Sequence, residues 1–175
     1  MKVLIIGAGG QLGKALIKNQ PDNIRLFTPI RKELDLSRPD SCEDYLKACK
    51  PDWVINAGAF TAVDMAEEKK DLALAVNATS VKTISEYLFK NGGKLIQLST
   101  DFVFDGSKNS PYKIDDKTSP INFYGKTKCQ AENFAMKYLN ETNQIYILRT
   151  SWLMGPIGKN FALTMLNLLA NKDSI

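Results

Sequence analysis

The stretch KVLIIGAGGQLG at residues 2–13 constrains the fold more than any other part of the sequence. A short run of β-branched and apolar residues is typical of a buried strand, and Gly7, Gly10 and Gly13 follow it at a spacing of three. In such a turn one glycine permits the bend, one lets the backbone approach a pyrophosphate, and one lets the following helix pack on the strand. The first N–H groups of that helix then face the anion. The stretch predicts a dinucleotide-binding turn, with a plain strand-to-helix connection as the alternative.

Apolar strands and amphipathic helices alternate along the rest of the 175 residues. Strands are expected at 2–6, 24–28, 33–37, 53–59, 94–100 and 145–151. Helices are expected after the glycine turn, through 42–50 with Ser37 or Asp40 as the cap, over about 64–90 with a break near Asp71, over 123–140 and over 160–171. This alternation predicts an α/β fold, a Rossmann-type doubly wound parallel sheet with helices on both faces. We expect one NAD(P)-binding domain over 1–175, in which residues 101–121 form a long functional loop.

Composition removes several function classes. The chain contains no histidine, which excludes a Ser-His-Asp triad. Its three cysteines show no CxxC pairing, so we expect reduced thiols, no metal site and no disulfide framework. The net charge of +4 is dispersed, which gives no support to nucleic-acid binding. The apolar run at the N-terminus is too short for a signal peptide or a membrane span, and we expect a soluble cytoplasmic protein.

The second expected strand bears on the choice of cofactor. NAD-specific sites usually carry an acidic residue at its end, whereas a basic residue accommodates the 2′-phosphate of NADP. Here the sequence LFTPIRK has no acid but contains Arg31 and Lys32. This favours NADPH, with NADH as an alternative cofactor, and ordinary solvated charges as a competing interpretation. Asp35 either accepts a hydrogen bond from the adenine amino group or caps a turn.

Small and polar residues follow the next two expected strands. The segment NAGA at 56–59 lets a flat cofactor lie against backbone, and Thr61 follows within reach of a cofactor hydroxyl or phosphate. Ser99 and Thr100 end the strand 94–100, and because side chains alternate along a strand only one of them faces the cleft. A satisfied loop start is the alternative for this strand end.

The helix expected over 123–140 carries the most informative pair. Tyr124 and Lys128 are four residues apart and share the stripe that holds Ala131, Ala135 and Leu139. Lysine is uncommon on an apolar stripe, so a function explains Lys128 better than a side chain that only snorkels to the surface. Asn77 likewise lies on the apolar face of its helix, where a buried amide needs partners.

Together these features resemble the extended short-chain dehydrogenase/reductase family, and within it the branch of dTDP-4-dehydrorhamnose reductases. The resemblance runs from Met1 to the last helix. It is carried by GAGGQLG, INAGAFTAVDMAE, VNATSV, STDFVFDG, YGKTKCQAE and LRTSWLMGPIGKNF.

The resemblance implies reduction of the 4-keto group of dTDP-4-dehydro-L-rhamnose to dTDP-L-rhamnose, in nucleotide-sugar and polysaccharide biosynthesis. It implies that Tyr124 is the proton donor, that Lys128 lowers the pKa of Tyr124 and holds the nicotinamide ribose, and that Thr100 polarises the keto oxygen. Asp101 and Trp152 match positions that touch the sugar nucleotide. The positions that match cofactor contacts are Gly10, Gln11, Leu12, Asp35, Leu36, Ala59, Phe60, Thr61 and Leu98. A homodimer, and Mg²⁺ at an interface as in some relatives, are further implications.

The family chain continues into a C-terminal lobe that supplies much of the sugar-nucleotide site, and we expect this lobe to be absent from residues 1–175. Turnover by these residues alone is therefore an open question. Two other functions stay open: a sugar-nucleotide epimerase or dehydratase with the same motifs, and a non-catalytic nucleotide-binding regulatory subunit.

Overall fold

The computed structural model describes residues 1–158 and 160–171. Five parallel strands form one sheet in the order β2-β1-β3-β4-β5. The elements, in chain order, are β1 (Lys2–Ile6), α1 (Gln11–Lys18), β2 (Arg25–Phe27), α2 (Pro39–Cys49), β3 (Trp53–Asn56), α3 (Val63–Glu68), α4 (Lys70–Leu74), the π-helical turn η1 (Ala75–Thr79), α5 (Ser80–Asn91), β4 (Lys94–Thr100), the 3₁₀ turn η2 (Asp101–Val103), α6 (Phe123–Leu139), β5 (Ile145–Thr150) and α7 (Phe161–Asn171).

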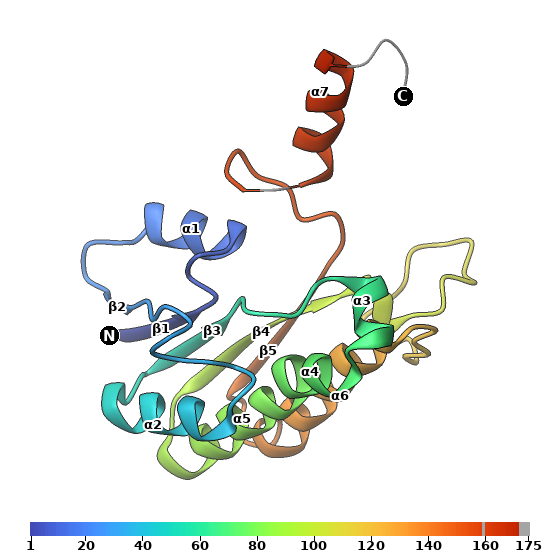
Figure 1. The fold of residues 1–175 in the computed structure, drawn as a ribbon. Helices are drawn as coiled ribbons and strands as arrows, with labels where there is room; N and C mark the ends of the chain where they lie inside the picture. Colours follow the sequence, from blue (N-terminus) through green and yellow to red (C-terminus); the bar gives the residue numbers. More distant parts are fainter. Residues whose placement is uncertain (159, 172–175) are drawn as a thin grey trace.

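Helices lie on both faces of the sheet, as the sequence predicts. Figure 1 shows α1 on one face and α2, α4, α5 and α6 on the other, with α7 standing clear of the sheet. Alternate residues of β1 divide between the two faces: Leu4 and Ile6 join the core under α2, α5 and α6, while Val3 and Ile5 pack with Leu16 of α1. The predicted doubly wound α/β fold is confirmed.

The expected strand at 33–37 is wrong. The Asp35 carboxylate accepts hydrogen bonds from the backbone N–H and the hydroxyl of Ser37, and Ser41 Oγ accepts from the backbone N–H of Asp35. These local bonds replace a strand ladder, since short polar side chains compete for backbone groups. Only Leu34 of this segment is buried. The third of the six expected strands is therefore a loop, and the sheet has five strands.

The helices also depart from expectation in detail. Arg38 occupies the N-cap of α2 and Pro39 its first position, because Ser37 is already bonded to Asp35, so neither Ser37 nor Asp40 is the cap. The long helical stretch does break near Asp71, at Lys69. It then continues through a π-helical turn before α5, an irregularity frequent at functional sites.

Candidate active site

The glycine turn brings the exits of β1 and β3 into close contact. Gly7 has φ of +81°, and a Cβ there would lie 2.6 Å from the backbone nitrogen of Gly58. A Cβ on Gly13 would lie 2.3 Å from the Gly7 carbonyl oxygen, so only glycine lets α1 pack this close to the strand. Gly10 is the N-cap of α1 and makes no side-chain cap, which leaves the first N–H groups of the helix without a side-chain acceptor. The turn has the shape that an anion-binding loop needs.

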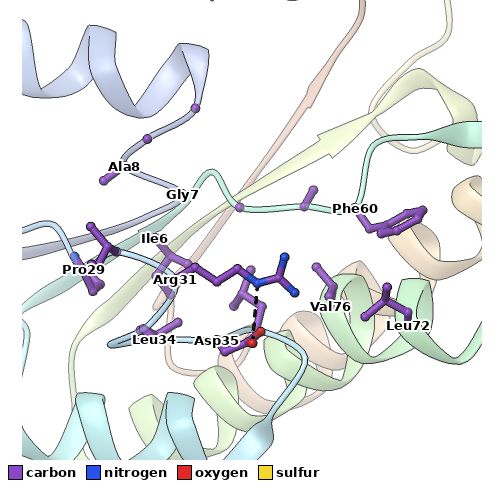
Figure 2. A pocket seen from close by; sticks show the side chains of 16 residues that line it. Ile6, Gly7, Ala8, Pro29, Arg31, Leu34, Asp35, Phe60, Leu72 and Val76 are labelled. Carbon is purple, nitrogen blue, oxygen red and sulfur yellow. Dashed lines mark ion pairs between the residues drawn. The ribbon is translucent and has the colours of Figure 1, made fainter.

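A pocket of about 430 Å³ opens beside this turn. It lies at the point where the chain switches from β2 to the other side of β1, which is where open α/β sheets bind ligands. Figure 2 shows the pocket between the glycine turn and the first turns of the α4–α5 stretch. The residues that line it are Ile6, Gly7, Ala8, Gly9, Gly10, Pro29, Ile30, Arg31, Leu34, Asp35, Leu36, Gly58, Ala59, Phe60, Leu72 and Val76. Apolar side chains predominate among them, which suits a flat ring such as adenine.

Two charged residues that line this pocket form an ion pair. Arg31 Nε lies 3.6 Å from Asp35 Oδ2, drawn as the dashed line in Figure 2, and the Arg31 side chain is 76% exposed. The hydrogen bonds from Ser37 hold the pKa of Asp35 below its ordinary value, and Arg31 contributes in the same direction. Asp35 therefore does cap a turn, and Arg31 supplies an exposed positive charge at the pocket.

Seven of the expected cofactor residues line the pocket: Gly7, Gly10, Arg31, Asp35, Leu36, Ala59 and Phe60. The others lie beyond its wall: Gln11, Leu12, Gly13, Thr61, Asn77, Leu98, Tyr124 and Lys128. Gln11 donates to the carbonyl of Leu153 and accepts from Asn160, which ties α1 to the segment after β5. Thr61 is exposed after β3.

Thr100 and Ser99 at the end of β4 take opposite directions. The Thr100 hydroxyl donates to Asp101 Oδ1 at 3.0 Å and accepts from the backbone N–H of Phe102 at 3.2 Å. Ser99 points instead toward α6 and donates to Glu132 at 2.5 Å. Asp101 also accepts from the hydroxyl of Ser151 after β5, at 2.8 Å. Of the two hydroxyls, Thr100 is the one at the open edge of the sheet.

Tyr124 lies in the first turn of α6, half-buried, with its ring edge-on to Phe102 at 5.7 Å between centroids. Burial raises the pKa of the phenol, and the nearby Thr100 hydroxyl offsets part of this rise. The lowering influence on this pKa is therefore Thr100, where the resemblance implies Lys128. A raised pKa keeps the phenol protonated at neutral pH, the state in which it can donate a proton.

Lys128 is 3% exposed, and its Nζ donates to the carbonyl of Leu98 at 2.6 Å. The expected apolar stripe is confirmed, because Ala131, Ala135 and Leu139 are fully buried beside it. Burial lowers the pKa of Lys128 to about 8, and the negative charge of Glu132 opposes this. Lysine is rarely buried this deeply without a role. Its ammonium group therefore lies near the carboxyl end of β4, at the carbonyl of Leu98.

Asn77 joins the pocket to α6. Its Oδ1 accepts from the backbone N–H of Phe60 at 2.8 Å, and its Nδ2 donates to the Phe60 carbonyl at 3.1 Å and to Thr127 Oγ1 at 3.0 Å. The buried amide thus finds the partners that the sequence requires it to have. Phe60 lines the pocket, and Thr127 precedes Lys128 on α6. The irregular backbone of η1 places Asn77 for these contacts.

Trp152 lies just after β5 and is 64% exposed. Its φ of +51° is unusual for a bulky side chain, and its ring meets Phe161 edge-on at 4.7 Å between centroids. The neighbouring Ser151 bonds to Asp101, so Asp101 and Trp152 belong to the same rim of the sheet. An exposed aromatic ring on this rim is available to a ligand.

One buried acidic residue near Lys128, Glu132, was not among the predicted site residues. Glu132 is 4% exposed and binds Ser99 and Arg149. The available signal was its place four residues after Lys128, on the same apolar stripe. The apolar wall of the pocket formed by Leu72 and Val76 was also missed, because nothing local marks which apolar residues border a cavity.

Two further observations concern metals and membranes. Among residues 1–158 and 160–171, His, Cys, Asp and Glu side chains nowhere gather in the groups of three or more that hold metal ions. In the same part of the chain, each helix falls short of the length and apolar character needed to cross a bilayer.

Comparison with known proteins agrees with this geometry. The family model described as the RmlD substrate binding domain matches residues 1–175. A dTDP-4-dehydrorhamnose reductase from Aggregatibacter actinomycetemcomitans is 39% identical over 174 residues, covering 98% of this chain and 58% of that protein.

Solved structures lead to the same family. A dTDP-4-dehydrorhamnose reductase from Clostridium acetobutylicum superposes with a TM-score of 0.92 at 38% identity, over 99% of this chain and 61% of the other. The same enzyme from Bacillus anthracis, in complex with NADP, gives 0.93 at 34% identity, again over 99% and 61%. This chain thus spans about three fifths of the length of the proteins it matches. Matched by the family model from its first residue to its last, the chain belongs to the RmlD substrate binding domain family.

Proposed function

We propose that this chain is the cofactor-binding part of a reductase that converts the 4-keto group of dTDP-4-dehydro-L-rhamnose to a hydroxyl, giving dTDP-L-rhamnose, with NADPH as the reductant. One observation carries the proposal. Thr100, Tyr124 and Lys128 converge at the sheet edge that also bears the glycine-turn pocket. Family membership and the names of the relatives support the same reaction.

The pocket fits a dinucleotide. The close approach at Gly7 leaves no room for a side chain, so the backbone itself borders the site for a pyrophosphate. The slot that includes Leu34, Leu72 and Val76 suits adenine, and Arg31 stands where it can meet a 2′-phosphate. The NADP bound in the Bacillus anthracis relative supports NADPH over NADH. We place the remaining cofactor contacts at Gln11, Leu12, Gly13, Thr61, Asn77 and Leu98, along the path from this pocket to Lys128.

The proposed chemistry needs a hydride, which the nicotinamide supplies when the cofactor is bound. Tyr124 protonates the oxygen that becomes the new hydroxyl, and its raised pKa keeps the proton available until then. The Thr100 hydroxyl donates a hydrogen bond to the same oxygen in place of its bond to Asp101, and so polarises the carbonyl. We assign to Lys128 the role that the resemblance implies, in which its charge stabilises the phenolate that forms and its ammonium group holds the nicotinamide ribose, in addition to the lowering of the Tyr124 pKa by Thr100.

On the substrate side we propose that Asp101 and Trp152 touch the sugar nucleotide, since both lie on the rim beside Thr100. We further propose that residues 1–175 form one NAD(P)-binding domain and that a C-terminal lobe supplies the other sugar-nucleotide contacts. A reaction that depends on orientation slows severely when half of the positioning contacts are missing.

Turnover tests both parts of the proposal. NADPH consumption is followed at the nicotinamide absorbance band with the 4-keto sugar nucleotide, for the 175-residue chain and for a chimera that adds the remaining residues of the Aggregatibacter relative. We expect the chimera to turn over at least about 100-fold faster than the chain alone.

Each other outcome has a distinct meaning. Equal rates would overturn the proposal that a C-terminal lobe completes the substrate site. No NADPH consumption by either protein would overturn the proposal that the protein is a reductase. Conversion of the sugar without net loss of NADPH would indicate an epimerase or a dehydratase. NADPH binding without reduction, together with a co-purifying protein partner, would indicate a regulatory subunit.

A further inference from the structure

An ion pair between Glu132, which is buried, and Arg149, whose side chain is 25% exposed, lies one helical turn beyond Lys128. The Glu132 carboxylate accepts hydrogen bonds from Arg149 Nε at 3.0 Å and from Arg149 Nη2 at 2.7 Å, a bidentate pairing. It also accepts from Ser99 Oγ. Glu132 belongs to α6, Arg149 to β5 and Ser99 to β4, and Ser99 and Arg149 are paired residues of neighbouring strands. One carboxylate therefore joins three elements.

This carboxylate fastens the part of α6 that carries the catalytic groups. Lys128 and Glu132 are four residues apart, so they lie on the same face of the helix. Lys128 binds the carbonyl of Leu98, and Glu132 binds the side chain of the next residue, Ser99. The two contacts together set how far α6 can slide or rotate against the end of β4.

Arg149 extends the attachment to the loop after η2. Its Nη1 donates to the carbonyl of Ile114 at 3.3 Å, and its guanidinium lies 5.0 Å from the centre of the Phe104 ring. The Phe104 ring in turn stacks on Tyr112 at 4.0 Å. The loop that follows Thr100 and the helix that carries Tyr124 are thus held by the same side chain.

Stability alone is a weak reason for such a pair. Removing two charges from water is costly, and apolar residues of similar volume often stabilise a core as well as a buried ion pair does. Directional hydrogen bonds can fix one register between the elements they join, which apolar packing does less well. Because Glu132 lies four residues after Lys128 and binds Ser99, the register fixed here is that of α6 against β4.

We propose that Glu132 is a positioning residue: held by Ser99 and Arg149, it sets α6 against the end of β4 and so places the Lys128 ammonium at the nicotinamide ribose. This inference rests on the proposed function, since it assumes that a nicotinamide dinucleotide binds along this edge. Glu132 itself touches neither cofactor nor substrate.

Two ligands separate positioning from general loosening. NADPH reaches from the glycine turn to Lys128, whereas 2′,5′-ADP carries only the adenosine end and never meets Lys128. Dissociation constants for both are measured by titration calorimetry on the 175-residue chain and on Glu132→Gln, Lys128→Met and the double variant. Glu141→Gln, an exposed carboxylate just beyond α6, is the matched control.

We expect Glu132→Gln to weaken NADPH by about tenfold and to leave 2′,5′-ADP within about twofold of the parent chain. In the Lys128→Met background the same change should weaken NADPH no further, because its effect passes through Lys128. Glu141→Gln should change neither constant. Equal weakening of both ligands, a full additional loss in the Lys128→Met background, or no loss at all would overturn the inference.

The proposed function can fail separately. If the parent chain binds no NADPH, the cofactor proposal is overturned. If the parent chain binds NADPH but Glu132→Gln weakens NADPH and 2′,5′-ADP equally, only the positioning role of Glu132 is overturned. Should Glu132→Gln unfold, Ser99→Ala removes one of the three hydrogen bonds and keeps the ion pair. This milder variant should show a smaller loss of NADPH affinity with the same indifference to 2′,5′-ADP, and an equal loss for both ligands would again contradict the inference.

Discussion

Tyr124 is subject to three influences on the pKa of its phenol. Burial raises this pKa most, the Thr100 hydroxyl lowers it, and the negative charge of Asp101 raises it further. A donor that keeps its proton until the substrate oxygen becomes basic is what the proposed reduction needs. Lys128, whose pKa is lowered to about 8 by burial, is then the group that loses its proton first as the pH rises.

The pH dependence of turnover follows from these two groups. Turnover by the chimera should fall as the pH rises through about 8, because Lys128 loses the charge that stabilises the phenolate. Tyr124→Phe should lower kcat by about 10²–10⁴-fold and leave the dissociation constant of NADPH within about threefold. A rate that stays constant to pH 10 would contradict the role of Lys128, and a fully active Tyr124→Phe would contradict that of Tyr124.

Lys128 should also destabilise the folded chain at neutral pH. Its pKa is about 8 in the folded chain against an ordinary value of 10.5, which it regains on unfolding, so between these values the unfolded chain binds more protons. The free energy of unfolding therefore rises with pH across this window, and the penalty is fully present below pH 8.

The comparison of the parent chain with Lys128→Met isolates this effect. The variant should be the more stable at pH 7, and its advantage should shrink by up to about 1.4 kcal/mol per pH unit between pH 8 and 10.5. Denaturant unfolding at several pH values measures it. A constant difference in the free energy of unfolding across that range would show that Lys128 is not buried in its charged form.

At the scale of elements, the contact between α1 and β1 depends on Gly13, which has no side chain. A Cβ on Gly13 would meet only backbone, the Gly7 carbonyl oxygen at 2.3 Å and the Ala8 Cα at 2.6 Å. Neither atom can move without shifting the turn. Helix propensity alone would favour alanine at this position by about 1 kcal/mol, so the two effects have opposite signs.

Gly13→Ala should lower the free energy of unfolding by about 1–3 kcal/mol and weaken NADPH binding, because overpacking displaces the turn. Gly9→Ala, where a Cβ meets nothing within 4 Å, should change stability by less than about 0.5 kcal/mol. Denaturant midpoints of the two variants decide the matter. Gly13→Ala as stable as Gly9→Ala would mean that α1 does not need this close approach.

The strands show what the sequence can and cannot predict. The pattern of KVLII and KLIQLST gives β1 and β4 with their observed ends, because each is a buried run bounded by turn residues. The segment ELDLS has a strand-like alternation yet forms a turn, since Asp35 bonds to Ser37. The expected strand at 53–59 ends at Asn56, where the backbone of residues 57 and 58 packs against Gly7.

The site residues likewise divide into those that the sequence can predict and those that it cannot. Local spacing is enough to propose Gly7, Gly13, Tyr124 and Lys128 as site residues, because each is marked by its place at a strand exit or on a helix face. Local spacing does not identify Glu132, because its hydrogen-bond partners are distant in the sequence. Ser99 is 33 residues away and Arg149 is 17 residues away. Long-range partners of this kind are set by the topology of the sheet.

For the whole molecule, the sheet order decides where chemistry can occur. β1, β3 and β4 are neighbours and parallel, so the glycine turn, Ala59 and Thr100 all lie at one edge. Asn77 bridges Phe60 of the pocket and Thr127 of α6, which connects the two halves of the site. Figure 1 shows this edge running from the start of α1 to the start of α6.

The central claim is that one dinucleotide spans this edge, from Arg31 to Lys128. A crystal structure of the chain with NADPH tests it most directly. We predict adenine in the pocket with the 2′-phosphate at Arg31, the pyrophosphate at the glycine turn, and the nicotinamide beside Tyr124. Space should remain for one substrate oxygen within about 3 Å of the hydroxyls of Tyr124 and Thr100. Adenosine bound outside the pocket, or a nicotinamide turned away from Tyr124, would contradict the account.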